Sequence, residues 1–97
     1  MNSILQKIYK QHKISRYEKD GVIISTVWKN IAWETVISHP QFNNGNFISV
    51  NMSNSNEEES LRLHKAWVNL MTQQELPNKI QDVTGTFFKR QENATRI

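Results

Sequence analysis

A chain of 97 residues, 37% of them hydrophobic, can bury one core, so we expect a single domain over residues 1–97. The sequence has no cysteine, which excludes disulfides and thiolate metal sites, and its net charge of +3 argues against mimicry of DNA, which needs a strongly acidic surface. No signal peptide or transmembrane helix is visible, and we therefore expect a cytoplasmic protein.

The N-terminal third contains one element of ambiguous type and one clear hairpin. The apolar residues between 2 and 12 have helical spacing and predict a short N-terminal helix, although the same residues could begin a strand. Asp20-Gly21 is a preferred two-residue loop, because both central positions of such a turn need positive φ. It predicts a hairpin between Ile14–Lys19 and Val22–Val27, with Tyr17 opposite Ile24.

The next segment predicts two further strands. Residues 32–38 alternate in polarity and form the third strand. Asn44-Gly45 repeats the hairpin signal, which would place Phe42 opposite Phe47 as an aromatic pair. In the strand that follows, the expectation is that Ile48, Val50 and Met52 share one face. With a tight turn over residues 29–31, the two hairpins form a sheet of about four antiparallel strands.

An amphipathic helix over about residues 56–73 is the main helix of the prediction. Ser55 and Glu58 have the spacing of a capping box, and the glutamates at 57–59 suit the positive end of the helix dipole. The apolar positions fall in one half-circle, which predicts a helix lying on the sheet. The fold class is therefore α+β. Residues 78–83 could form another short helix, and we expect the polar tail from about residue 89 to be mobile.

Two side chains in these elements are candidates for chemistry. His64 lies in the middle of the apolar arc of the helix, either as a base in a pocket or as a core histidine bonded to a strand side chain such as Thr35 or Glu34. Glu34 lies in an apolar strand and would need a partner such as His64 or Arg16 if it is buried. A Glu–His pair could perform acid–base chemistry. However, no nucleophile, oxyanion loop or phosphate-binding glycine run accompanies the pair, and we expect no enzyme, no metal and no cofactor.

The tryptophans and the basic residues offer two kinds of binding surface. Trp28 and Trp33 either fill the core together with Trp67, which we favour, or anchor an interface. Basic residues with tyrosines between them could instead follow a phosphate backbone, or simply form a solvated face. These candidates for a nucleic-acid surface are Lys7, Lys10, Lys13, Arg16 and Lys19.

Three short motifs resemble a group of small phage and prophage proteins of unassigned function. They are Ser-Thr-Val-Trp at 25–28, Trp-Glu-Thr at 33–35 and the helix start through His64, and the resemblance covers about residues 21–71. The group tends to have alanine where this chain has Ser60. The resemblance implies a phage setting and a compact sheet–helix domain, and it implies no catalytic activity.

These observations lead to one main hypothesis and two alternatives. The main hypothesis is a non-enzymatic protein that binds a host protein or complex in the cytoplasm of the host cell. Such a protein could inhibit a bacterial defence system, as anti-CRISPR proteins do. The candidate binding residues are Trp28, Trp33, Glu34 and His64. The alternatives are a nucleic-acid or nucleotide binder and a virion or assembly component. The sequence leaves the oligomeric state open.

Overall fold

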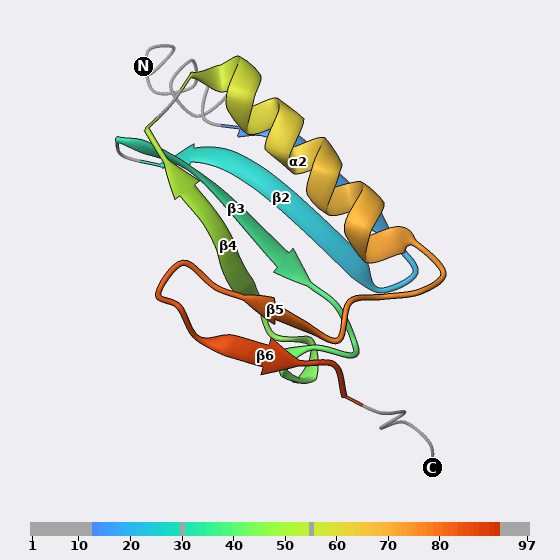
Figure 1. Cartoon of the computed structure of the whole chain (residues 1–97). Helices are drawn as coiled ribbons and strands as arrows, with labels where there is room; N and C mark the ends of the chain where they lie inside the picture. Colours follow the sequence, from blue (N-terminus) through green and yellow to red (C-terminus); the bar gives the residue numbers. More distant parts are fainter. Residues whose placement is uncertain (1–12, 30, 55, 92–97) are drawn as a thin grey trace, which may run out of the picture.

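The computed structural model describes residues 13–29, 31–54 and 56–91, without the side chains of residues 13 and 14. In chain order the elements are β1 (Lys13–Lys19), β2 (Val22–Lys29), β3 (Ala32–Ser38), η1 (Asn43–Gly45), β4 (Ile48–Ser53), α2 (Glu57–Thr72), β5 (Lys79–Gln81) and β6 (Phe87–Lys89) (Figure 1). The predicted helix over residues 2–12 lies outside the described residues. So does the end of the tail expected to be mobile. At its start, the backbone N–H groups of Arg90 and Gln91 donate to the carbonyl oxygens of Asn78 and Gln41, both at 2.7 Å.

The predicted α+β architecture is confirmed: β1, β2, β3 and β4 form one antiparallel sheet in that order, and α2 packs on one of its faces. The first hairpin is also confirmed, with Tyr17 opposite Ile24. Asp20 and Gly21 have φ values of 52° and 82°, the left-handed conformation that this loop requires. Lys29 pairs with Ala32, which leaves only two residues for the turn between β2 and β3.

The second hairpin differs from the prediction. Ile37 pairs with Ile48, and the chain between them forms a long loop with a bridge from His39 to Phe42 and the short helix η1. Phe42 is therefore not opposite Phe47: it is completely buried, while Phe47 is 54% exposed. Asn44 and Gly45 do have the positive φ values that the turn signal predicts, 54° and 83°. The chain already turns at Pro40 and Gln41, however, where the backbone N–H of Phe42 donates to the carbonyl oxygen of His39 at 3.0 Å. This earlier turn places Phe42 in the core, away from Phe47.

A β-bulge in β4 overturns a second prediction. Val36 pairs with Ser49 but Thr35 pairs with Asn51, so Val50 is an extra residue in β4. The bulge shifts the alternation of side chains by one residue. Ile48 is buried on the helix side, whereas Met52 lies beside Glu34 on the opposite face and is 50% exposed. Ile48 and Met52 therefore do not share a face.

Helix α2 lies within the predicted range but begins with a different cap. The side chain of Asn56 accepts a hydrogen bond of 2.8 Å from the backbone N–H of Glu59, so the N-cap is Asn56 and not Ser55. Asn56 and Glu59 have the same three-residue spacing as the predicted pair of Ser55 and Glu58. The pattern Ser-Asn-Glu-Glu-Glu satisfies the spacing rule in two adjacent registers, and the sequence does not distinguish them.

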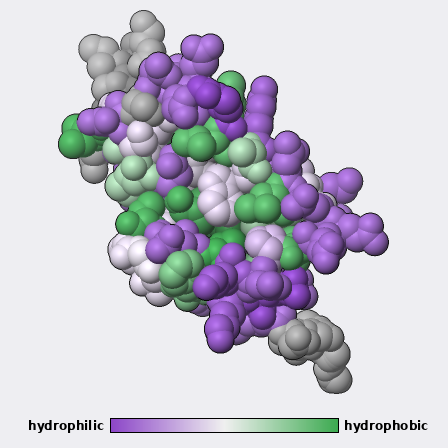
Figure 2. Space-filling view, viewed as in Figure 1, coloured by the Kyte–Doolittle hydropathy of each residue, from purple (hydrophilic) through white to green (hydrophobic). Residues whose placement is uncertain are grey.

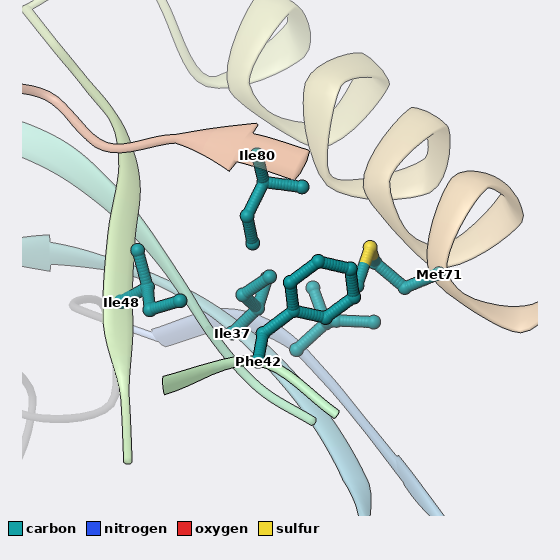
Figure 3. Packing of buried hydrophobic residues seen from close by; sticks show 6 residues of the cluster. Ile37, Phe42, Ile48, Met71 and Ile80 are labelled. Atoms are coloured by element: carbon teal, nitrogen blue, oxygen red, sulfur yellow. The ribbon is translucent and has the colours of Figure 1, made fainter. Parts of the chain in front are cut away.

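The segment after α2 forms a β-hairpin, not the short helix expected over residues 78–83. In strands β5 and β6, Ile80 pairs with Phe88. Ile80 packs into a buried cluster with Met71 from α2 and with residues from the sheet and the loop before β4 (Figure 3). The members of this cluster are Ile24, Ile37, Phe42, Ile48, Met71 and Ile80.

The four-stranded sheet thus has two different faces. We call the face under α2 the inner face; the β5–β6 hairpin contributes Ile80 to the core on this same side. Hydrophilic residues run along the outside of α2, and hydrophobic residues gather between α2 and β4 in the same view (Figure 2). The opposite face, which we call the outer face, carries Arg16, Glu18, Ile23, Ser25, Val27, Glu34, Val36, Ser49 and Met52.

Candidate functional site

A chain of hydrogen bonds connects the helix to the centre of the inner face. Oγ1 of Thr26 lies 2.8 Å from Nδ1 of His64 and 2.7 Å from Oγ1 of Thr35. All three side chains are buried, with 0%, 3% and 0% exposure for Thr26, His64 and Thr35. Both hydrogen bonds form when the hydroxyl of Thr35 donates to Thr26 and the hydroxyl of Thr26 donates to Nδ1 of a neutral imidazole. Burial lowers the pKa of His64 below its ordinary value of 6.5, which agrees with this arrangement.

A hydroxyl next to an imidazole has the geometry of a nucleophile with its base. Here, however, the hydroxyl of Thr26 is enclosed between sheet and helix, and Thr35 occupies its other side. A substrate would have to displace α2 to reach this oxygen. The arrangement therefore favours the core-histidine interpretation of His64, whose bonded partner is Thr26; Thr35, named from the sequence as a partner, bonds to Thr26 instead.

Two polar atoms near these residues are buried and have no hydrogen-bond partner among the described residues: Nδ2 of Asn51 and Oγ of Ser60. Asn51 pairs with Thr35 in the sheet, and Ser60 precedes His64 by one turn of α2. The sequence pattern did not identify either residue. For Asn51 the reason is the bulge at Val50, which turns its side chain to the inner face.

Trp28 and Trp33 also lie on the inner face, beyond Thr26 and Thr35. They are cross-strand neighbours, and their rings meet edge to face with centroids 5.0 Å apart. Trp33 is buried, whereas Trp28 is half-buried. Trp67 is half-buried as well and packs against the buried hydrophobic cluster that contains Phe42 and Met71. The structure brings Trp28 and Trp33 together beside the polar residues of the core, and neither ring belongs to the outer face.

Glu34 lies on the other side of the sheet from His64, because Trp33 and Thr35 on either side of it face the helix. The hydroxyl of Ser49 donates to Oε2 of Glu34 at 2.9 Å, and Nζ of Lys29 lies 3.8 Å from Oε1. The carboxylate is therefore held in the middle of the outer face by two neighbouring strands. The Glu–His pair considered from the sequence does not form, and Arg16 is not the partner of Glu34.

The basic residues form no continuous surface in the part of the chain that the structure describes. Lys7 and Lys10 lie outside it, and of Lys13 only the backbone is described, as the first residue of β1. Nη2 of Arg16 lies 3.1 Å from Oε1 of Glu18, so a carboxylate offsets its charge. Lys19 lies at the exposed end of β1, where it borders an open hollow of about 470 Å³ with Tyr17 and His39.

The outer face was not identified from the sequence, although a signal was present. The run from Val22 to Val27 contains apolar residues on both faces, whereas a strand with one solvated face alternates apolar and polar residues. Ile23, Val27 and Val36 are half-buried there, and no described element packs over them. Among the described residues there is also no group of three or more side chains able to hold a metal ion, and no helix long and apolar enough to span a membrane.

No protein-family model matches this chain, and neither the curated proteins nor the solved structures include a significant match. The comparisons therefore supply no family and no relative from which a function could be transferred. The resemblance to small phage proteins stays a hypothesis.

Proposed function

We propose that this protein acts without catalysis, by binding a host protein or protein complex through the outer face of its sheet. The observation that supports this proposal best is the composition of that face. Ile23, Val27 and Val36 are half-buried, and Met52 is 50% exposed, yet no described element covers them. An antiparallel sheet with one face in water normally carries polar residues on that face. Apolar residues on an uncovered face are typical of interaction sites.

Glu34 gives this surface a feature that a partner could recognise. Its side chain is only 14% exposed and is oriented by Ser49 and Lys29. A partner that covers the outer face would bury this carboxylate further, and it would have to supply a donor or a cation to compensate. A fixed charge among apolar side chains therefore favours a specific partner over general adhesion.

The proposal of a non-enzymatic role is supported by the burial of His64, whose only described hydroxyl neighbours are enclosed with it. The phage setting rests on the resemblance over residues 21–71 and is not a property of the fold. Within that setting, a small cytoplasmic protein that binds host machinery could inhibit a bacterial defence system, as anti-CRISPR proteins do. This narrower role is an analogy of size and setting.

The test is affinity capture from a bacterial host extract at low and at high salt. Met52→Glu and Val27→Lys place charges on the outer face, and we expect both variants to lose the captured partner while their circular dichroism spectra stay unchanged. Phe87→Glu is the matched control, since Phe87 has a similar exposure of 54% but lies on the β5–β6 hairpin. It should capture the partner as the wild-type chain does.

Three results would contradict the proposal. One is capture that survives both outer-face variants, and another is capture that Phe87→Glu abolishes equally. The third is binding of an oligonucleotide with an affinity that falls steeply between low and moderate salt, which would favour the nucleic-acid alternative. A large defined oligomer in light scattering would instead indicate the virion or assembly role.

A further inference from the structure

The two edges of the four-stranded sheet are different. At the β4 edge, the backbone N–H of Val83 donates to the carbonyl oxygen of Ser49 at 2.9 Å, and the bulge at Val50 interrupts the strand. At the β1 edge, no described residue pairs with the strand. The irregularity of β1 is confined to its start, between Lys13 and Ser15, which leaves residues 15–19 regular. An open and regular edge strand is a template for another strand.

The charges along this edge allow one symmetric pairing. Arg16 and Glu18 both point to the outer face, because they are opposite Ser25 and Ile23 in β2. In an antiparallel pair of identical strands centred on Tyr17, Arg16 of each copy lies opposite Glu18 of the other. Centring the pair on Arg16 or on Glu18 would place like charges opposite each other at the centre. The charges therefore disfavour the neighbouring registers and favour a single one.

We propose that β1 is a self-association edge, through which two copies of this chain form a continuous eight-stranded sheet with Tyr17 at the two-fold axis. The pairing is isologous, since the same five residues serve on both sides. The charged groups are available for it. The side chains of Arg16 and Glu18 are 42% and 59% exposed, and among the described residues they form an ion pair only with each other, within one strand. In the dimer each would gain a partner across the edge.

The helix would add to this interface. α2 packs over β2 and β1, so the two-fold axis brings the second α2 alongside the first. Thr72 of α2 and Tyr17 of β1 border the same hollow, which identifies the side of α2 that lies near β1. Leu61 and Val68 lie on the same side of the helix as Thr72, and both are half-buried. Apolar side chains on this flank would lose solvent contact. The two outer faces would also join into one surface, but the proposal does not depend on the function of that face.

Charge reversal tests both the edge and its register. Sedimentation velocity or light scattering of the full chain, from about 10 μM to about 1 mM, covers the weak affinities that a small interface gives. We expect a concentration-dependent dimer. Arg16→Glu and Glu18→Arg each create two like-charge contacts and should raise the dimer Kd about tenfold or more. Arg16→Glu with Glu18→Arg in one chain should restore the wild-type Kd.

Mixing the two single variants is the sharpest experiment. The Arg16→Glu variant carries Glu at positions 16 and 18, and the Glu18→Arg variant carries Arg at both. A heterodimer centred on Tyr17 therefore has all four charges paired, although neither chain regains its internal ion pair. We expect the mixture to dimerise and the separate variants to stay monomeric at the same concentration. Lys89→Glu and Glu75→Arg make the same changes of net charge at exposed positions outside β1 and serve as controls.

Each other outcome overturns the proposal. A wild-type chain that stays monomeric throughout the range has no self-association edge. A mixture that does not form heterodimers, or a double variant that stays monomeric, excludes the register centred on Tyr17. Controls that weaken association as much as Arg16→Glu and Glu18→Arg would indicate an effect of net charge alone.

Discussion

Nδ1 of His64 and Oγ1 of Thr26 lie 2.8 Å apart, and this contact joins α2 to the centre of the sheet. The two residues are separated by 38 positions in the sequence, so the hydrogen bond fixes a tertiary relationship. A polar contact inside an apolar interface stabilises one docking geometry, because a shifted helix would leave the imidazole or the hydroxyl without a partner.

The two ends of this hydrogen bond should respond differently to substitution. His64→Leu removes the imidazole, but Thr26 keeps Thr35 as its partner, so we expect the free energy of unfolding to change by less than about 1.5 kcal/mol. Thr26→Val leaves a buried imidazole nitrogen unpaired and should destabilise the protein by about 1–3 kcal/mol. Urea unfolding measures both variants. His64→Leu should also retain its partner in the capture assay. Loss of capture with an intact fold would instead make His64 a binding residue.

The stability should decrease in weak acid. Burial lowers the pKa of both His64 and His39 below the ordinary value of 6.5, so the unfolded chain binds more protons than the folded chain once the pH falls to about that value. The free energy of unfolding should then be constant above about pH 7.5 and should fall as the pH drops through 6.5 towards the lower, folded-state pKa values. His39 contributes for an additional reason: its Nδ1 accepts a hydrogen bond from the backbone N–H of Gln41 at 3.0 Å, which a protonated ring cannot do.

His64→Leu separates the two contributions to this pH dependence. The variant retains only the part that is due to His39, so its stability should fall less steeply below pH 6.5 than that of the wild-type chain. The measurement is urea unfolding at several pH values between 5 and 8. A wild-type stability that rises on acidification would contradict the burial of both imidazoles in their neutral form.

The hairpins show which part of the fold the sequence could predict. Asp20-Gly21 determined its turn because the two residues need only their own φ values to be satisfied. Asn44 and Gly45 carry the same signal and also adopt positive φ, yet Phe42 and Phe47 on either side of them do not pair. Phe42 is instead buried with residues from α2 and β5, a contact that no local pattern contains. Local turn chemistry was sufficient in the first case, and long-range packing was decisive in the second.

The candidate site was only partly predictable. The alternation of Trp33, Thr35 and Ile37 was recognised, and it already implied that Glu34 faces away from the helix and from His64. The direction of Met52 could not be inferred, since Ile48, Val50 and Met52 read as regular alternation and nothing in their identities marks Val50 as a bulge. The bonding of His64 to Thr26 depends on how α2 is placed along the strands, which periodicity does not determine.

Phe42 should contribute more to stability than Trp67. Phe42 is completely buried in the hydrophobic cluster with Met71 and Ile80, whereas Trp67 is only half-buried. We expect Phe42→Ala to reduce the free energy of unfolding by about 3–5 kcal/mol and Trp67→Ala to reduce it by less, about 2–3 kcal/mol. Urea unfolding of both variants gives the order. Equal effects, or a larger effect of Trp67→Ala, would contradict the observed core.

The N-cap of α2 predicts different effects on stability for substitutions at the neighbouring residues Ser55 and Asn56. Asn56→Ala removes the acceptor for the backbone N–H of Glu59 and should destabilise the protein by about 0.5–2 kcal/mol. Ser55→Ala is the control, because the capping position is already filled by Asn56, and it should have little effect. Thermal unfolding of the two variants distinguishes the caps. A larger effect at Ser55 would restore the capping box expected from the sequence.

Two buried serines should respond in opposite directions to replacement by alanine. Ser60 is completely buried, and its hydroxyl has no partner among the described residues, so Ser60→Ala removes an unsatisfied polar group and introduces a better helix former. The hydroxyl of Ser38 donates to the carbonyl oxygen of Gly45 at 2.6 Å, and Ser38→Ala leaves that contact unmade.

We therefore expect Ser60→Ala to raise the free energy of unfolding by about 0.5–2 kcal/mol and Ser38→Ala to lower it by about 1 kcal/mol. Urea unfolding under identical conditions measures both. If Ser60→Ala is instead destabilising, its hydroxyl has a partner, such as a buried water molecule shared with Nδ2 of Asn51, and both polar atoms are satisfied in solution.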